Sequence, residues 1–414
     1  MLRLDSNMLY QAVKSVMPGL PTRRNFLPII DNIFVSGNGK LELSATNLEI
    51  VIERTLNIQS EQDFMACVPG KTLERLSKNA SGEVTLSTPE TGKLHVEDAR
   101  GSQDVSAWAD STDFPSLPFA IGSLVGYSQV HVKEFIDTCK PLLEKTDGSG
   151  ERFNLDCLNF NKGRIEATDG HRLAFTEASW IPETIKSLIP YDSMKRALKS
   201  LETIKKGNPE IIVDFHSEGI LINAGELTIR IKTRQGDYPD INKVLPQKTG
   251  DPCIFDKTEL TKALKLVGLM TSTRNRCVKM LVENGKATVR CDNPDLGHGQ
   301  TRISYSGSPE MRFVGINVDY LMDALKSQTS EHVAIQITAS TDAILVNDEV
   351  VMPMRDAVKP EDRDRMRESY KSEIPELDPD HKHDWLADVP EQFYEWKWNR
   401  RGSMFAGTWR RKAA

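Results

Sequence analysis

The sequence predicts an α+β protein in which one domain of helices and antiparallel sheet is repeated three times. An amphipathic helical pattern, with apolar residues at i, i+3, i+4 and i+7, begins at Leu9, Val132 and Leu260, which lie 123 and 128 residues apart. A strand-like run that ends in a polar turn follows each of these patterns. A second helical segment and alternating strands complete each copy, so internal repetition fixes the architecture.

The first helix of each repeat is expected to bury four apolar positions on one face. These positions are Leu9, Ala12, Val13 and Val16, then Val132, Phe135, Ile136 and Cys139, then Leu260, Ala263, Leu264 and Val267. Asp5 or Ser6 and Asp256 stand where helix N-caps belong, and Pro141 is expected to kink or end the helix of the second repeat.

The remaining elements recur in the same order. Strand-like runs cover 43–48, 165–170 and 289–294, and second helices are predicted over 71–78, 194–200 and 321–327. Alternating strands such as 210–215 and 332–337 imply sheets with one buried face. We therefore predict helices on the inner face of antiparallel sheets, in domains 1–124, 125–249 and 250–356, followed by an extension over 357–414.

Composition is ordinary for a globular protein, with 414 residues of which 39% are hydrophobic and 27% charged. No run approaches the ~18 apolar residues of a membrane span, and the N-terminus does not resemble a secretory signal, which predicts a cytoplasmic protein. The six cysteines form no CxxC pair and are expected to be reduced, buried thiols rather than metal ligands or disulfides. No cofactor and no metal site are expected.

The net charge of −6 argues against a protein covered in nucleic-acid contacts, but it permits one basic channel. The predicted helices repeatedly carry basic residues on their exposed faces, where acidic residues are fewer. A basic surface lined by helices would attract phosphates without reading bases, although an ordinary solvated face explains any single lysine. The basic residues are Lys14, Lys71, Arg75, Lys78, Lys133, Lys140, Lys195, Arg196, Lys199, Lys262, Lys265 and Lys326.

Three motifs carry a resemblance to a known family. Thr-Asp-Gly-His-Arg-Leu-Ala at 168–174, Tyr-Pro-Asp at 238–240 with Val-Leu-Pro at 244–246, and Val-Val-Met-Pro-Met-Arg at 350–355 follow one another in that order. The same order occurs in bacterial sliding clamps, the beta subunits of replicative DNA polymerase III, which the chain resembles over residues 1–356. Leu-Pro-Ile at 27–29 and Asn-Val-Asp-Tyr at 317–320 are also similar to that family.

The resemblance implies a head-to-tail homodimer whose six domains form a ring around duplex DNA. Leu269 and Met270 would then lie at the contact between subunits. A clamp that slides needs dispersed cationic contacts and no array that reads bases. The residues expected to face DNA are Arg24, Lys71, Arg75, Lys78, Lys133, Lys195, Arg196, Lys199, Lys262 and Lys265.

The resemblance also implies a pocket that takes partner peptides of roughly Gln-x-x-Leu-x-Phe type. The partners would be a DNA polymerase III alpha-type subunit, a clamp loader and other proteins with a clamp-binding motif. Apolar walls, pliant methionines and a few polar groups suit such a peptide. The implied pocket residues are Leu155, Thr168, Gly170, His171, Arg172, Leu173, Pro239, Val244, Asn317, Tyr320, Val351, Met352, Pro353, Met354 and Arg355.

The extension beyond residue 356 departs from the family, whose members end near the equivalent of Arg355. Residues 357–391 contain six Lys/Arg and eleven Asp/Glu, which predicts a solvated linker. Residues 392–414 interleave aromatic and basic residues, a pattern that suits single-stranded nucleic acid, a protein surface, or packing on this protein's own domains. His381 and His383 could bind a metal, but two histidines alone are more typical of a polar linker.

Two other functions compete with a sliding clamp. Asp169, His171 and Arg172 lie in one turn as catalytic groups do, but no partner nucleophile, phosphate loop or metal quartet accompanies them, so we expect no enzyme. The alternative is a specialised or mobile-element clamp-like scaffold, which binds clamp partners without acting as the main processivity factor.

Overall fold

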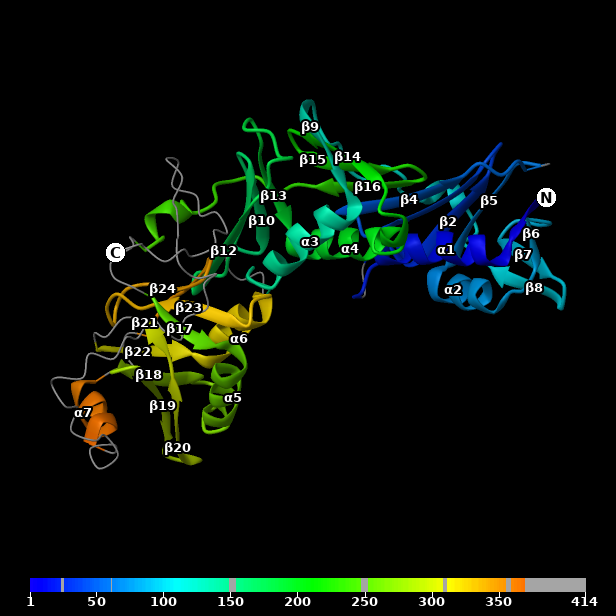
Figure 1. The fold of residues 1–414 in the computed structure, drawn as a ribbon. Helices are drawn as coiled ribbons and strands as arrows, with labels where there is room; N and C mark the ends of the chain where they lie inside the picture. Colours follow the sequence, from blue (N-terminus) through cyan, green and yellow to red (C-terminus); the bar gives the residue numbers. More distant parts are fainter. Residues whose placement is uncertain are drawn as a thin grey trace. The chain divides into compact units, whose positions relative to one another are not determined.

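The computed structural model describes residues 1–23, 26–60, 62–148, 154–246, 252–307, 311–354 and 359–368. Over these residues the order strand, helix, four strands, helix, three strands occurs three times, with one extra short strand, β21 (Ser306–Gly307), in the third copy (Figure 1). The predicted α+β repeat is therefore confirmed.

The elements of the three copies correspond one to one. The first copy comprises β1 (Leu2–Asp5), α1 (Ser6–Val16), β2 (Asn32–Gly37), β3 (Leu41–Thr46), β4 (Ile50–Leu56), β5 (Phe64–Pro69), α2 (Gly70–Asn79), β6 (Glu83–Ser87), β7 (Lys93–Asp98) and β8 (Gly101–Ser106). The second comprises β9 (Leu124–His131), α3 (Val132–Leu143), β10 (Cys157–Asn161), β11 (Arg164–Thr168), β12 (Arg172–Glu177), β13 (Lys186–Pro190), α4 (Tyr191–Leu201), β14 (Glu210–His216), β15 (Gly219–Ala224) and β16 (Leu227–Lys232). The third comprises β17 (Cys253–Asp256), α5 (Lys257–Gly268), β18 (Cys277–Glu283), β19 (Lys286–Asn293), β20 (Gly297–Ser304), β22 (Arg312–Asn317), α6 (Val318–Ser327), β23 (His332–Gln336), β24 (Ile344–Val346) and β25 (Glu349–Val351).

The first helix of each copy buries all four positions that the apolar pattern predicts. Asp5 caps α1 by accepting hydrogen bonds from the amides of Asn7 (2.9 Å) and Met8 (3.3 Å). Asp256 caps α5 in the same way, through the amide of Glu259 at 2.8 Å. Pro141 lies inside α3, which ends at Leu143.

The chain divides into two compact units. Unit 1 contains Met1–Ala167 and Thr176–Tyr238, and unit 2 contains Thr168–Phe175 and Pro239–Ala414. In unit 1, one sheet has the order β1-β6-β7-β8, a second has the order β5-β2-β3-β4-β16-β15-β14-β9, and β13, β10 and β11 are successive neighbours. Helices α1 to α4 lie along one side of the eight-stranded sheet (Figure 1).

In unit 2, one sheet runs β12-β25-β24-β23-β17-β21 and another runs β20-β19-β18-β22. The apolar core of this unit joins residues of both sheets to buried residues of α5 and α6, such as Leu264 and Leu321. The predicted domain boundaries near residues 124 and 249 stay a prediction, because the two compact units do not divide the chain at these positions.

All six cysteines are buried with free thiols. Burial raises the pKa of Cys67 to about 11, so this thiol stays protonated near neutral pH. Among the described helices, none has the length and apolar character needed to cross a membrane.

One element was not predicted. The sequence analysis assigned residues 357–391 to a solvated linker, but Pro360–Glu368 form a helix, α7. That prediction is wrong for these residues. Residues 369–414, including His381, His383 and the aromatic-basic end, lie outside the described residues.

Candidate partner-binding site and basic helix faces

The turn between β11 and β12 is held by its own side chains. Gly170 has a φ of +84°, a conformation that glycine adopts without strain. The hydroxyl of Thr168 accepts from the amide of Gly170 at 3.0 Å and donates to the carbonyl of Arg172 at 2.6 Å. The Asp169 carboxylate accepts from the amides of His171 and Arg172, both at 2.9 Å. The turn is therefore rigid before any ligand arrives.

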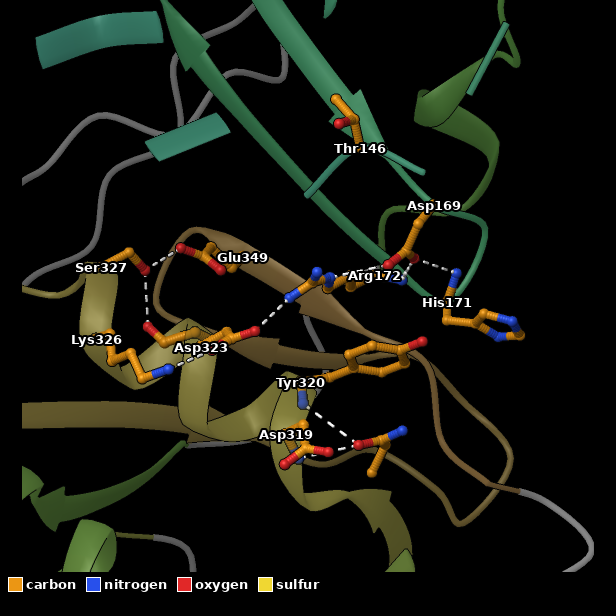
Figure 2. Close-up of polar contacts among 12 residues, drawn as sticks. Thr146, Asp169, His171, Arg172, Asp319, Tyr320, Asp323, Lys326, Ser327 and Glu349 are labelled. Carbon is orange, nitrogen blue, oxygen red and sulfur yellow. Dashed lines mark hydrogen bonds and ion pairs between the residues drawn. The ribbon is translucent and has the colours of Figure 1, made fainter. Parts of the chain in front are cut away.

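The Arg172 side chain connects this turn to helix α6. Its Nε donates to Asp169 Oδ2 at 2.9 Å, and its Nη1 donates to Asp323 Oδ2 at 2.8 Å (Figure 2). The guanidinium carbon lies 4.9 Å from the centre of the Tyr320 ring, within cation–π range. Burial alone would raise the pKa of Asp323, but hydrogen bonds from Lys326 and Arg172 outweigh it and hold that pKa below its usual range.

Tyr320 presents an aromatic surface beside the turn. Its ring stacks with the exposed His171 ring at a centroid distance of 6.0 Å and an interplanar angle of 18°. The tyrosine is placed by the first turn of α6, where Asn317 accepts from the amides of Asp319 (2.9 Å) and Tyr320 (3.4 Å). Asn317 thus acts here as a helix cap.

The C-terminal segment of the resembling region runs beside the same turn. β25 pairs with β12, so that Val351 stands opposite Arg172, and the side chains of Leu173 and Val351 are buried. The amide of Met352 donates to the carbonyl of His171 at 2.8 Å, and the amide of Met354 donates to the carbonyl of Gly315 at 2.8 Å. Two partly exposed methionines are thereby fixed next to His171 and β22.

The structure thus brings together the implied pocket residues at 168–173, 317, 320 and 351–354. Pro239 and Val244 belong to the same unit and are exposed, flanking the short helix η5 (Ile241–Lys243). Leu155 belongs to unit 1, and Arg355 lies outside the described residues. Their membership of the pocket stays a prediction.

Eight of the ten residues expected to face DNA have exposed side chains. They are Lys71, Arg75 and Lys78 on α2, Lys133 on α3, Lys195 and Lys199 on α4, and Lys262 and Lys265 on α5. Arg24 lies outside the described residues. Exposure permits phosphate contacts without demonstrating them.

Arg196 requires a correction, because the sequence analysis placed it on an exposed helix face. Its side chain is only 6% exposed. Nη1 donates to the carbonyls of Pro18 (2.8 Å) and Leu20 (2.5 Å), and Nε donates to Asp192 at 2.6 Å. Arg196 therefore connects α4 to the segment that follows α1, and its guanidinium does not face solvent.

Helix α7 packs on the sheet of the third repeat, on the side opposite α5 (Figure 1). Asp362 pairs with Lys279 at 2.7 Å, and Arg367 makes two hydrogen bonds to Glu283, at 3.0 and 2.5 Å. Met366 is completely buried. A signal for α7 was present in the sequence, since Pro360 begins the helix, Glu361 and Asp362 follow, and arginines fill its last turn.

Comparison with known proteins gives a consistent result. Residues 1–118 match the model of the N-terminal domain of the DNA polymerase III beta subunit, and residues 242–358 match that of its C-terminal domain. The beta sliding clamp of Pseudomonas aeruginosa is 26% identical over 358 residues, covering 82% of this chain and 96% of that protein. That of Escherichia coli is 24% identical over 364 residues, covering 83% and 96%.

Solved structures share the fold. A crystal structure of the DNA polymerase III beta subunit from Pseudomonas aeruginosa matches with a TM-score of 0.78 at 22% identity, covering 86% of this chain and 99% of that one. The beta subunit from Thermotoga maritima matches with a TM-score of 0.77 at 19% identity, with the same coverage.

Three copies of one α+β unit, with helices on one side of antiparallel sheets, define a protein with the sliding-clamp fold. The chain belongs to the DNA polymerase III beta subunit family. The matched C-terminal model ends at residue 358, so α7 lies beyond it.

Proposed function

We propose that two copies of this chain close head to tail into a ring around duplex DNA, and that the ring tethers DNA polymerase and other replication or repair proteins. The observation that carries this proposal is that β8 and β20 are edge strands of their sheets in the described part of the chain. Their equivalents in the other repeats pair with each other and join one repeat to the next.

The joints between repeats follow one rule. The fourth strand of the first repeat, β4, pairs with the last strand of the second, β16. The fourth strand of the second repeat, β12, pairs with the last strand of the third, β25. Applied once more, the rule pairs the fourth strand of the third repeat, β20, with the last strand of a first repeat, β8.

Within the described residues both strands are edges of their sheets. The residues of β8 are exposed apart from Val105, and those of β20 are exposed or partly exposed. A sheet edge offers unpaired amides and carbonyls to another strand. A β8–β20 contact between copies joins different surfaces of the two copies, head to tail. Such contacts form a ring when the rotation that relates one copy to the next brings the last copy back to the first. Two copies of three repeats would give six equivalent positions around the ring.

Exposed lysines on helices of all three repeats support a non-specific hold on duplex DNA. Phosphate contacts fix a protein on the duplex without reading its sequence, so the ring could move along it. The residues proposed for this role are Lys71, Arg75, Lys78, Lys133, Lys195, Lys199, Lys262 and Lys265, with Arg24 as implied by the resemblance.

The rigid turn at 168–172, the Tyr320 ring and the two methionines support the partner-peptide pocket. Methionine adapts to varied apolar side chains, and the exposed His171 ring offers polar edges to a peptide. We assign no catalytic role to these residues, since the relatives are sliding clamps. A cytoplasmic location fits this function.

Loading on DNA tests the proposal. The full chain, placed on a nicked circle by a clamp loader, should remain bound through gel filtration and leave after the circle is cut once. Equal retention on circular and linear DNA would contradict encirclement. A chain that binds clamp-binding peptides but neither loads nor increases polymerase processivity would support the specialised scaffold instead.

A further inference from the structure

Helices α2 and α4 are equivalent, and they differ in what covers them. Each begins directly after a proline that ends a strand, Pro69 before Gly70 and Pro190 before Tyr191. Position n of α2 therefore corresponds to position n + 121 of α4, which makes Arg75 the equivalent of Arg196.

One face of α4 is covered by the end of α1. Ser200 donates to the carbonyl of Ser15 at 2.7 Å, and Arg196 donates to the carbonyls of Pro18 and Leu20 and, through Nη2, to the hydroxyl of Thr22 at 3.2 Å. The residues of this covered face are all buried. They are Ser193, Arg196, Ala197 and Ser200.

The same face of α2 is open to solvent in the described part of the chain. Thr72, Arg75 and Asn79 are exposed and Leu76 is partly exposed, although their α4 equivalents are all buried. Helix α1, the first helix of the first repeat, covers α4, the second helix of the second repeat. The rule that joins the repeats places the third repeat of another copy before the first repeat. The helix expected to cover α2 is therefore α5 of another copy.

Helix α5 has a matching face that is exposed in the described part of the chain. The N-caps Asp5 and Asp256 set an offset of 251 residues, so that Leu266 corresponds to the buried Ser15 and Leu269 to Pro18. The side chains of Leu266 and Leu269 are 59% and 69% exposed. By the same offset, Thr271 corresponds to Leu20 and Thr273 to Thr22.

We propose that Arg75 anchors the second copy of the chain by donating to the main-chain carbonyls of Leu269 and Thr271 and to the Thr273 hydroxyl. The contact rests on the ring proposed above. Carbonyls at the end of a helix lack intrahelical partners and carry partial negative charge, which suits a guanidinium. Leu266 and Leu269 would pack against Leu76 and the aliphatic stem of Arg75.

One difference between the helices strengthens this assignment. Arg196 also pairs with Asp192 on its own helix, but Lys71 stands at the equivalent position of α2. Lys71 repels the guanidinium of Arg75, whereas Asp192 accepts a hydrogen bond from Arg196. The Arg75 guanidinium is therefore directed to acceptors on the partner copy. Arg75 accordingly leaves the set of residues assigned to DNA.

The test is a dilution series of the full chain without DNA, followed by sedimentation equilibrium. Arg75→Ala should raise the dimer dissociation constant at least tenfold, because loss of a central interface arginine is typically of this size. Arg75→Lys should recover little, because an ammonium cannot bridge two carbonyls as a planar fork does. Lys78→Ala is the matched control and should change the constant less than threefold, because its equivalent Lys199 is exposed in α4.

The outcomes separate the contact from the ring. A wild-type chain that is monomeric at micromolar concentration would overturn both proposals. A wild-type dimer that Arg75→Ala and Lys78→Ala affect equally would overturn the Arg75 contact alone. Circular dichroism spectra of the variants, recorded well below the melting temperature, should match that of the wild type, because Arg75 is exposed in the single chain.

Discussion

Replacing Met366 by alanine removes the buried side chain on which the docking of α7 depends. Met366 lies between the two ion pairs to Lys279 and Glu283. Side chains alternate along a strand, so Leu281 points to the same face of β18 as those two residues, and it is also buried. We infer that Met366 packs on Leu281.

The expected magnitude follows from these contacts. A buried methionine cut to alanine typically costs 2–5 kcal/mol, and we expect about 2 kcal/mol because a surface helix can settle over the gap. A helix of nine residues has little stability of its own, so almost all of the lost free energy is lost from the docking of α7 on the sheet. The open form of α7 should therefore become roughly thirtyfold more populated.

Hydrogen exchange with mass spectrometry measures this directly. Peptides covering 360–368 should lose protection by about that factor in Met366→Ala, while those covering α6 should not change. Asp364→Ala changes an exposed residue of the same helix and serves as the control. Unprotected α7 amides in the wild type, or equal protection in both variants, would refute the docking argument.

Three further predictions concern the site and the extension. Met354→Ala should weaken a clamp-binding peptide about thirtyfold in a fluorescence-anisotropy titration, as loss of an interface hot spot does, while the exposed Met65→Ala should not. Burial alone would raise the pKa of Asp323, but hydrogen bonds from Lys326 and Arg172 lower it below the ordinary value of 3.8. The ionised carboxylate therefore contributes its full stabilisation above pH 3.8, and this stabilisation is lost as the pH falls through the lowered pKa. The difference in urea midpoint between wild type and Asp323→Asn should accordingly disappear towards pH 2, and a difference that persists there would exclude this cause. Deleting residues 369–414 should change peptide affinity or partner choice while preserving the dimer, and identical binding by both chains would make the extension a structural accessory.

The repeat and the helix cores could be predicted from sequence because they depend on local periodicity. Apolar spacing alone identified the four buried positions of α1, α3 and α5. Polar residues before them identified Asp256 as a cap and left Asp5 or Ser6 as the other, of which the structure shows Asp5. The polar turn that ends the 165–170 run was predicted from the residue pattern, but its place in a binding site came only from the family motif. Its hydrogen bonds show why those residue types recur, since Thr168 and Asp169 must accept main-chain amides around a glycine of positive φ.

What sequence reasoning missed depends on packing between repeats. Periodicity assigned Arg196 and Arg75 to the same solvated helix face, and only the fold shows that α1 covers one of them. Helix α7 was missed for another reason. The acidic composition of residues 357–391 outweighed the helix-start signal of Pro360. In the structure α7 exchanges charges of both signs with β18, through Asp362 with Lys279 and Arg367 with Glu283.

The docking of α7 changes how the extension can act. Sequence reasoning alone would start a solvated linker at residue 357, close to the implied pocket wall, with the aromatic-basic end free to return there. Since α7 is held on β18 by Lys279 and Glu283, the predicted linker instead begins at residue 369. The 23 residues from 369 to 391 would span roughly 27 Å by random-coil scaling. Effective concentration falls with distance from the anchor, so the sheet β20-β19-β18-β22, on which α7 docks, and partners that bind beside it come within reach first.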